Sequence, residues 1–486
     1  MARNIKILFL AAEADPFVKV GGLGDVAGSL PGALRALSPH LDVRLCIPLH
    51  RSLNLDGFEV KPFASYAVPR GGHQMPARVF ETNYSGTPVY LIDGSPISSA
   101  QSVYSSDMSS DGEKYTFFSL AALELLQHVH WQPNIIHAND WHTAPTVYAL
   151  HQRLSDPHYA WIKSIMEIHN LPYMGGGASP FLNAYGLHPS SNPYLPDWAR
   201  HFPLPMALAA TDAIVAVSPA YARELLTPEF GCGLQDFLRT RANVLCGILN
   251  GIDLVSWNPK SDPALSKNYD VDELASRIDN KASLQSTLGL PADPGIPLLA
   301  MVTRMDPQKG VDIVVEGLRQ MADQSWQAIF LGTGIPYLEE AVRALQEEFP
   351  DRVRAEIRYD AHLSRQVYAG TDILLMPSRY EPCGLAQMIA MRYGCVPLGR
   401  ATGGLNDSIH AYTDTLNGTG FLFDDASAEA FANCLREALL VYNDKERWSK
   451  LQRNGMSQDF SWENAAKQYS DLYRQLLNNK DVERFR

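Results

Sequence analysis

Short apolar runs alternate along the chain with longer segments whose apolar residues recur at helical spacing. The first run covers residues 5–11, and a helical pattern follows it as far as Leu37. Continuous apolar runs of this length are typical of parallel strands that are buried on both faces. Repeated strand–helix alternation implies parallel sheets with right-handed crossovers. The pattern therefore predicts an α/β protein.

The same alternation extends through both halves of the chain. Strands are predicted at 5–11, 42–47, 58–68, 77–82, 88–92, 134–136, 161–168, 211–217 and 244–249, then at 298–302, 328–331, 352–357, 372–376, 395–398 and 420–423. Helices are predicted up to 37 and at 113–130, 143–154, 218–226, 311–322, 337–348, 363–370, 386–393, 405–411 and 428–442. Residues 95–112 and the Gly- and Pro-rich stretch up to 205 are expected to be loops, and residues 251–297 contain few apolar runs.

Size and composition narrow the class of protein. At 486 residues the chain is too long for a single core. A net charge of −12 argues against nucleic-acid or anionic-membrane partners, and no apolar run reaches 18 residues. The six cysteines form no CxxC pair or metal-ligand cluster, which favours a reduced, cytoplasmic setting without a metal. The chain enters its first strand almost at once, with no leader pattern.

A glycine-rich loop links the first strand to the first helix. Lys19 precedes Gly21, Gly22 and the acidic Asp25 in this loop. Glycines allow close backbone approach and the helix start offers N–H donors, so the arrangement suits a phosphate. A solvated loop lysine is the alternative. The loop is a weak match to the dinucleotide-binding pattern Gly-x-Gly-x-x-Gly, because Ala27 stands in the place of the third glycine. This counts against a nicotinamide oxidoreductase.

Polar side chains follow two further strands of the first half. Asp140 and His142 come after the strand at 134–136, and His169 and Asn170 come after the strand at 161–168. Polar groups at the end of a buried strand are unfavourable unless they bond something, which suggests a ligand. The alternative for Asp140, shared with Thr143, is to cap the following helix. Asn250 begins an Asn-Gly pair that marks a tight turn.

The second half has a cationic loop and an acidic one. Arg304 and Lys309, five residues apart, follow the strand at 298–302, where they could converge on a diphosphate or remain solvated. Glu381 follows the strand at 372–376, beyond the carboxyl end where open α/β sheets bind ligands. An ordinary solvated glutamate is the alternative for Glu381. Cys383 is as consistent with a packed thiol as with a functional one.

These motifs, in this order, resemble those of the bacterial glycogen synthases and plant starch synthases, which are retaining glycosyltransferases. They are Lys-Val-Gly-Gly-Leu at 19–23, His-Ala-Asn-Asp-Trp-His at 137–142, Ile-His-Asn at 168–170, Asn-Gly-Ile-Asp at 250–253, Arg-Met-Asp-Pro-Gln-Lys-Gly at 304–310, Pro-Ser-Arg-Tyr-Glu-Pro-Cys-Gly-Leu at 377–385 and Thr-Gly-Gly-Leu at 402–405. Each motif is weak alone, but together they are specific and run nearly end to end.

The resemblance implies a fold of two doubly wound Rossmann-like domains that face each other across a deep cleft (GT-B type). It places a glucan acceptor domain at residues 1–249, a nucleotide-sugar domain at 250–461, and a C-terminal helix at 462–486 that crosses back onto the first domain. The implied reaction transfers glucose from ADP-glucose to the non-reducing end of an α-1,4-glucan or maltooligosaccharide, with retention of configuration. No cofactor or metal is implied, and the cytoplasm is the expected compartment, or the plastid stroma if the source is a plant.

The resemblance also assigns roles to residues. It makes Glu381, His169, Lys19, Arg304 and Lys309 catalytic, with the three cations carrying the phosphate charge and Glu381 at the glucosyl group. The residues expected to bind substrate are Gly21, Gly22, Asp25, Tyr104, Asp140, Asn170, Asn250, Tyr359, Cys383, Gly384, Leu385, Thr402, Gly403 and Gly404. Among them, Asp140 is expected near the acceptor, Tyr104 in the pocket wall and Tyr359 on the nucleotide base.

The chain departs from the family pattern at a few positions. Asn139 replaces the second His of His-Ala-His-Asp, Ala401 stands where many relatives carry a basic residue, and Asn406 stands where Ala is frequent. These departures bear on the donor nucleotide. Three alternatives stay open. They are a UDP-glucose donor, a different acceptor, and a catalytically silent protein that binds sugar nucleotides or glucan.

Overall fold

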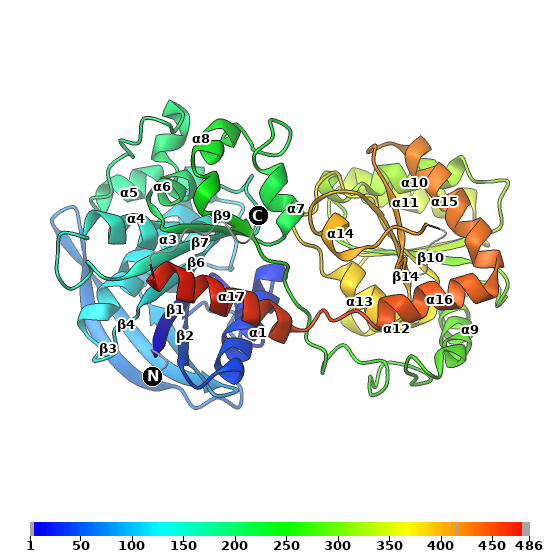
Figure 1. Ribbon diagram of the computed structural model, residues 1–486, viewed down its shortest axis with the longest axis horizontal. Helices are drawn as coiled ribbons and strands as arrows, with labels where there is room; N and C mark the ends of the chain where they lie inside the picture. The colour runs from blue at the N-terminus through cyan, green and yellow to red at the C-terminus, as the bar shows by residue number, and fades with distance from the viewer. Residues whose placement is uncertain (1–3, 414–416, 479–486) are drawn as a thin grey trace. The chain divides into compact units, whose positions relative to one another are not determined.

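The computed structural model describes residues 4–413 and 417–478, and the chain divides into two compact units (Figure 1). Unit 1 consists of residues 1–251 together with 462–486, and unit 2 of residues 252–461. The chain thus leaves unit 1 after Gly251 and returns to it at Trp462. The boundary expected from sequence lies two residues before the first of these points, and residues 479–486 of the expected C-terminal segment lie outside the described residues.

Unit 1 is built on a nine-stranded sheet, counted over the described residues, in the order β3-β4-β5-β2-β1-β6-β7-β8-β9. The strands are β1 (Ile5–Leu10), β2 (Leu41–Pro48), β3 (Lys61–Arg70), β4 (His73–Tyr84), β5 (Thr87–Asp93), β6 (Ile135–Asn139), β7 (Lys163–Ile168), β8 (Ala213–Ala216) and β9 (Leu245–Gly247). Strands β3 and β4 form an antiparallel edge, and the others are parallel. Each corresponds to a predicted strand, with ends that differ by a few residues.

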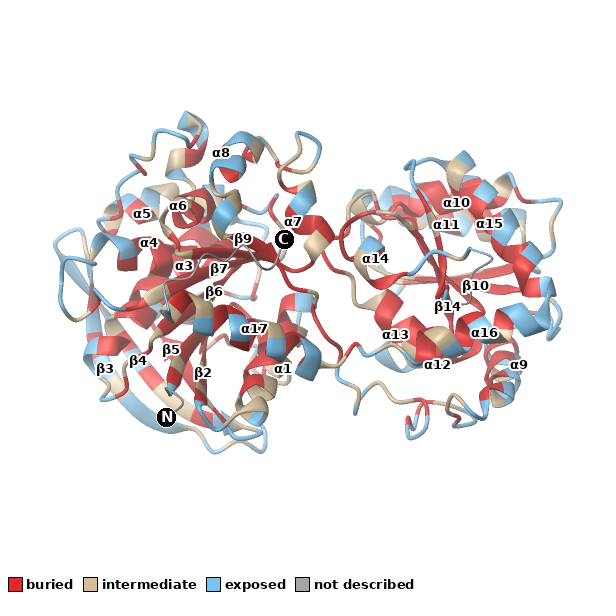
Figure 2. Ribbon diagram, viewed as in Figure 1, coloured by how far each residue is buried: buried red, intermediate tan, exposed pale blue. Residues whose placement is uncertain are grey.

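The helices of unit 1 cover this sheet. They are α1 (Gly22–Leu37), α2 (Ser95–Ser98), α3 (Met108–Glu124), α4 (Asp140–Gln152), α5 (Ser179–Ala184), α6 (Pro203–Ala210), α7 (Pro219–Glu224), α8 (Gln235–Thr240) and α17 (Trp462–Leu477). Helix α17, from the end of the chain, packs against α1, while α4 packs against α3 and α6. The central strands between these helices are buried (Figure 2), as their continuous apolar sequences predict.

Unit 2 contains a fully parallel sheet in the order β12-β11-β10-β13-β14-β15. The strands are β10 (Leu298–Val302), β11 (Gln327–Leu331), β12 (Val353–Glu356), β13 (Ile373–Met376), β14 (Val396–Arg400) and β15 (Phe421–Phe423). The helices are α9 (Arg277–Thr287), α10 (Val311–Arg319), α11 (Pro336–Glu348), α12 (Ala361–Gly370), α13 (Ala386–Arg392), α14 (Gly403–Ser408), α15 (Ala428–Asn443) and α16 (Lys445–Met456). Strand order 3-2-1-4-5-6 is that of the Rossmann fold.

Several predicted loops contain helices. The stretch 95–112 holds α2 and the first turn of α3, where the Asp107 side chain accepts the Ser109 N–H and caps the helix earlier than predicted. The Gly- and Pro-rich stretch that ends at 205 holds α5 and the start of α6. Proline lies in the first turn of both helices, where its missing N–H is tolerated, so the prolines that suggested a loop begin helices instead.

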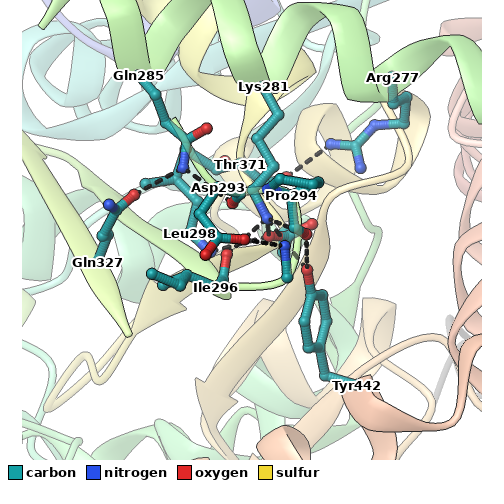
Figure 3. A network of polar contacts seen from close by, with 12 residues as sticks. Arg277, Lys281, Gln285, Asp293, Pro294, Ile296, Leu298, Gln327, Thr371 and Tyr442 are labelled. Carbon is teal, nitrogen blue, oxygen red and sulfur yellow. Dashed lines mark hydrogen bonds and ion pairs between the residues drawn. The ribbon is translucent and has the colours of Figure 1, made fainter. Parts of the chain in front are cut away.

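Helix α9 was missed because it is polar, and a buried polar network anchors it (Figure 3). The Lys281 ammonium donates to Asp372 Oδ2 at 2.8 Å, to the Ile296 carbonyl at 2.6 Å and to the Tyr442 hydroxyl at 3.1 Å. The same Asp372 oxygen accepts the Leu298 N–H at 2.8 Å. The network therefore fixes α9 to the amino ends of β10 and β13 through charge and hydrogen bonds, which an apolar pattern does not reveal.

Both sheets reverse their strand order next to the first strand. In unit 1 the reversal lies between β1 and β6, and in unit 2 it lies between β10 and β13. Ligands of open α/β sheets bind beyond the carboxyl ends of the strands at such points. The loops that follow these strands contain most of the predicted site residues. Within the described residues, every helix is too short or too polar to span a lipid bilayer.

Candidate active site

In unit 2, the predicted residues Lys309 and Glu381 lie together and follow the neighbouring strands β10 and β13. Lys309 Nζ donates to Glu381 Oε2 at 2.6 Å, and the Ser378 hydroxyl donates to the same oxygen at 2.9 Å. Glu381 is 4% exposed, so these two donors compensate a carboxylate that has lost most of its water. The structure thus joins two of the five residues predicted to be catalytic.

Arg304 lies on the same loop as Lys309 and keeps its guanidinium accessible. Its side chain is 63% exposed, and its Nη1 lies 3.1 Å from Asp306 Oδ2. The loop is held against the one after β13, because the Arg379 N–H donates to the Gln308 carbonyl at 2.7 Å. The loop with Arg304 and Lys309 and the loop with Glu381 are therefore held together where the strand order of unit 2 reverses.

The predicted residues Thr402, Gly403 and Gly404 pack against the backbone of the Glu381 loop. Gly403 has a φ of 45°, and a Cβ there would lie 2.0 Å from the Glu381 carbonyl oxygen. The Gly404 N–H donates to that same oxygen at 2.9 Å, and Thr402 is buried. The glycines are therefore needed for close backbone approach. The Gly404 N–H is thus engaged within the protein.

The remaining predicted residues of unit 2 differ in their surroundings. Cys383 is buried in the loop before α13, and Gly384 and Leu385 follow it at the start of that helix. Gly384 has a φ of 71°, which explains a glycine at this position. Tyr359 does not join the cluster, because it follows β12, two strands away from β10, and is 85% exposed.

In unit 1, Glu13 organises the loop that contains Lys19. Its carboxylate accepts the N–H groups of Val20 and Gly21, the second at 3.2 Å, and its Oε1 accepts the Tyr104 hydroxyl at 3.0 Å. Burial raises the pKa of Glu13, although the two backbone N–H groups oppose this shift. Glu13 therefore bends the loop back on itself and fixes Tyr104. Glu13 was not among the residues predicted from the sequence.

Lys19 lies three residues before the first residue of α1, and its ammonium is paired with a carboxylate. Its Nζ lies 2.6 Å from Asp25 Oδ1, in the first turn of the helix, and the side chains are 39% and 24% exposed. Gly21 occupies the position that precedes the helix, and Gly22 is its first residue. The four predicted residues of this loop thus lie together at the helix start.

His169 and Asn170 follow β7, and Asp140, the first residue of α4, holds their backbone. Asp140 Oδ1 accepts the His169 N–H at 2.8 Å and the Asn170 N–H at 3.3 Å. The interpretation of Asp140 or Thr143 as a helix cap is wrong, because α4 begins at Asp140 itself and Asn139 precedes it as the cap residue. Burial raises the pKa of Asp140, and the nearby His169 opposes that shift. Asp140 has a φ of 54°, an unusual backbone for an aspartate.

Two buried polar atoms near these residues have no hydrogen-bond partner among the described residues. They are Asn170 Oδ1 and His142 Nδ1. His142 packs against the rings of Tyr104 and Tyr115, with centroids 5.0 and 4.5 Å away, and burial lowers its pKa well below the usual value. Buried polar atoms are normally satisfied, so these two are candidates for ligand contact.

Asn250 lies apart from this group, and some important residues were not predicted. Asn250 follows β9 at the far edge of the sheet, where its buried Oδ1 also lacks a partner in the described part of the chain. Glu167, fully buried in β7, was not predicted to have a role. A lone glutamate within an apolar strand was the available signal, since a buried charge requires partners. Across residues 4–413 and 417–478, no three His, Cys, Asp or Glu side chains gather as a metal site would require.

Family comparisons cover nearly the whole chain. Residues 6–240 match the model described as the starch synthase catalytic domain, and residues 289–455 match glycosyl transferases group 1. The chain is 39% identical over 480 residues to a glycogen synthase of Clostridium botulinum, covering 97% of this chain and 99% of the relative. It is 38% identical over 491 residues to a glycogen synthase of Streptococcus gordonii, covering 97% and 100%.

Solved structures agree with the sequence relatives. The catalytic domain of starch synthase IV from Arabidopsis thaliana, bound to ADP and acarbose, matches with a TM-score of 0.88 and 32% identity over 98% of this chain and 100% of that one. A sucrose-phosphate synthase from Thermosynechococcus elongatus, at 20% identity and a TM-score of 0.62, shares the fold. Two Rossmann-like domains that match the starch synthase structure and the glycosyl transferases group 1 model define a glycosyltransferase of the GT-B class. The chain belongs to the glycogen synthase family and is a glucosyltransferase.

Proposed function

We propose that this enzyme transfers glucose from ADP-glucose to the non-reducing 4-hydroxyl of an α-1,4-glucan, with retention of anomeric configuration. The observation that carries the proposal is the buried Lys309–Glu381 pair beside the exposed Arg304, where the strand order of unit 2 reverses. The related starch synthase IV domain was solved with ADP. We assign the nucleotide sugar to unit 2 and the glucan acceptor to unit 1.

The leaving diphosphate requires fixed positive charge. When the glycosidic bond to phosphate breaks, the departing nucleoside diphosphate gains negative charge, and preorganised cations stabilise that charge. An ammonium has three N–H donors, and Lys309 uses one of them on Glu381, so two remain for phosphate oxygens. The Arg304 guanidinium offers a fork that matches two phosphate oxygens. In unit 1, we assign Lys19 to substrate phosphate as well.

The glucosyl group requires a carboxylate and neutral polar contacts. Glu381 is buried and held by Lys309 and Ser378, so it can bind glucose hydroxyls or stabilise positive charge at the anomeric carbon. In unit 1, we assign His169 and the unsatisfied Asn170 Oδ1 to sugar hydroxyls. Asp140 acts near the acceptor by holding the backbone of this loop.

The other predicted residues are assigned to the acceptor, the nucleotide base and the donor phosphates. Tyr104 forms the wall of the acceptor pocket, and the exposed Tyr359 ring is suited to stack on the nucleotide base. We assign residues 402–404, which pack closely on the Glu381 loop, to the surroundings of the donor phosphates. We propose a cytoplasmic setting, because the sequence relatives compared above are bacterial glycogen synthases.

The direct test is incorporation of labelled glucose into maltooligosaccharide, with ADP-glucose and UDP-glucose compared side by side in the presence of a chelator. Elongation with ADP-glucose that survives chelation is expected. Arg304→Gln should reduce kcat/KM for ADP-glucose about 10²-fold, since a charged phosphate contact is lost. Arg319→Gln, which removes an exposed arginine paired with Glu348 on the surface of unit 2, is the matched control and should leave the rate unchanged.

Four outcomes would contradict the proposal. Elongation with UDP-glucose alone would change the donor, and transfer that occurs only without added glucan would indicate another acceptor. Binding of ADP-glucose with no turnover, measured by calorimetry, would identify a silent binding protein. Loss of all activity on chelation would mean that Arg304, Lys309 and Lys19 do not supply the phosphate charge by themselves.

A further inference from the structure

A buried network in unit 1 connects helix α17 to the strands beneath His169. Glu167 and His137 are both fully buried, and His137 Nε2 lies 2.6 Å from Glu167 Oε2. Two tyrosines of α17 complete the network, because the Tyr469 hydroxyl donates to Glu167 Oε1 at 2.9 Å and the Tyr473 hydroxyl lies 2.8 Å from His137 Nδ1. Glu167 thus receives donors from a neighbouring strand and from the end of the chain.

Glu167 also lies beside the ring of His169. Its Oε1 is 3.5 Å from His169 Nε2, and the His169 side chain is 11% exposed. The hydrogen bonds from His137 and Tyr469 oppose the effect of burial and lower the pKa of Glu167, so the carboxylate stays charged. A fixed negative charge next to a ring nitrogen favours a proton on that nitrogen.

Asn139 identifies which nitrogen of His169 carries the proton. The Asn139 Nδ2 donates to the Leu10 carbonyl at 2.8 Å, so its amide oxygen is the atom that faces the ring. That oxygen lies 2.9 Å from His169 Nε2 and can only accept a hydrogen bond. Nε2 is therefore the protonated nitrogen. Nδ1 has no hydrogen-bond partner among the described residues, and in a neutral ring it is an acceptor.

We propose that Glu167 and Asn139 are positioning residues that hold His169 in its Nε2-protonated form, so that Nδ1 accepts a hydrogen bond from a sugar hydroxyl. Helix α17 takes part through Tyr469, which orients Glu167. The choice of a sugar hydroxyl rests on the proposed function, whereas the tautomer itself does not. The inference also gives a role to Asn139, which departs from the family motif.

The test uses the full-length protein labelled with ¹⁵N-histidine. The His169 signals are identified by their absence in His169→Gln, and the chemical shifts of the two ring nitrogens report the tautomer without substrate. The unchanged protein should show Nε2–H. Glu167→Gln should shift His169 toward a mixture of tautomers and lower turnover about 10- to 100-fold, the scale of one hydrogen bond to a charged group. Tyr469→Phe should lower turnover about two- to tenfold.

Tyr66→Phe is the matched control, because it removes a buried hydroxyl of unit 1 that donates to the Ala121 carbonyl, outside the network. It should change neither the tautomer nor the rate. Tyr469→Phe removes one hydroxyl only, so it tests the idea even if Glu167→Gln fails to fold.

Two results would overturn the inference. The first is an Nδ1–H tautomer in the unchanged protein. The second is an unaltered His169 signal in Glu167→Gln, or in Tyr469→Phe if Glu167→Gln fails to fold. A protein with the expected tautomer but no glucosyl transfer would instead contradict the proposed function alone.

Discussion

Unit 2 contains two buried lysine–carboxylate pairs at opposite ends of the same sheet. Lys281 and Asp372 meet at 2.8 Å beside the amino ends of β10 and β13, and their side chains are 6% and 11% exposed. Lys309 and Glu381 meet at 2.6 Å beyond the carboxyl ends of the same two strands, and their side chains are 17% and 5% exposed. Distance and burial alone do not distinguish the two pairs.

The pairs differ in how fully their hydrogen-bonding capacity is used. The Lys281 ammonium also contacts the carbonyls of Pro294 and Ile296 and the Tyr442 hydroxyl, so every donor has an acceptor. Among the described residues, the Lys309 ammonium has one hydrogen bond, to Glu381. A saturated pair can only stabilise the fold, whereas an ammonium with remaining donors can bind an anion. The number of partners thus separates a structural charge from a functional one.

Breaking the saturated pair should have the largest effect. Lys281→Met leaves Asp372 buried without its cation, which is expected to destabilise unit 2 by about 3–5 kcal/mol. Activity per folded molecule should be unchanged, because the pair is remote from the carboxyl ends of the strands. Hydrogen exchange of the β10 and β13 amides measures the loss in unit 2 directly.

Removing the Tyr442 hydroxyl is a milder change to the same network and serves as a control for Lys281→Met. Tyr442→Phe removes one neutral hydrogen bond to Lys281 and should lower stability by only about 1 kcal/mol. A Lys281→Met protein with normal exchange rates but lost turnover would reverse the assignment of the two pairs.

Changing the unsaturated pair should instead affect turnover. Glu381→Gln keeps the shape of the side chain and the contact with Ser378, but it removes the negative charge at the glucosyl group. We expect kcat to fall about 10²- to 10³-fold, the usual cost of one preorganised electrostatic contact, while ADP binding persists. Steady-state kinetics and calorimetry measure the two quantities.

Glu348→Gln, on the surface of α11, is the control for a generic loss of one carboxylate from unit 2 and should have normal kinetics. Near-normal turnover of Glu381→Gln would remove this residue from the reaction.

Arg379 and Asp312 form a third pair in unit 2, which is exposed, and breaking it should have the smallest effect of the three. Arg379 donates to both Asp312 oxygens, at 2.9 and 2.6 Å, and the side chains are 38% and 47% exposed. Because solvent screens such pairs, Asp312→Asn should cost at most about 0.5 kcal/mol at neutral pH.

The pH dependence of this third effect has a definite sign. The hydrogen bond from Arg379 lowers the pKa of Asp312 below its ordinary value of 3.8. The contribution is therefore complete above pH 3.8 and is lost as the pH falls through the lower, folded-state pKa. The melting temperatures of the unchanged protein and of Asp312→Asn should therefore converge as the pH falls. A difference that grows in acid would contradict this.

The sequence predicted the sheets well because buried parallel strands have continuous apolar sequences. It also located Lys309, Glu381 and His169, whose motifs follow such strands. It missed α9, since that helix is held by Lys281 and Arg277 rather than by an apolar face. The sequence alone did not pair Glu167 with Tyr469, because residues 302 positions apart meet only when the fold is complete.

The return of α17 to unit 1 has a consequence for synthesis of the protein. Unit 2 lies between the two parts of unit 1, so the ribosome makes all of it before Tyr469 and Tyr473 emerge. At about 5–20 residues per second, the 302 and 336 residues that separate these partners leave Glu167 and His137 without their phenol partners for roughly 15–70 s. Unit 2 can therefore fold during translation, while Glu167 and His137 of unit 1 still lack their hydrogen bonds to α17. A chain released before α17 would keep every predicted substrate contact and still lack the support of His169.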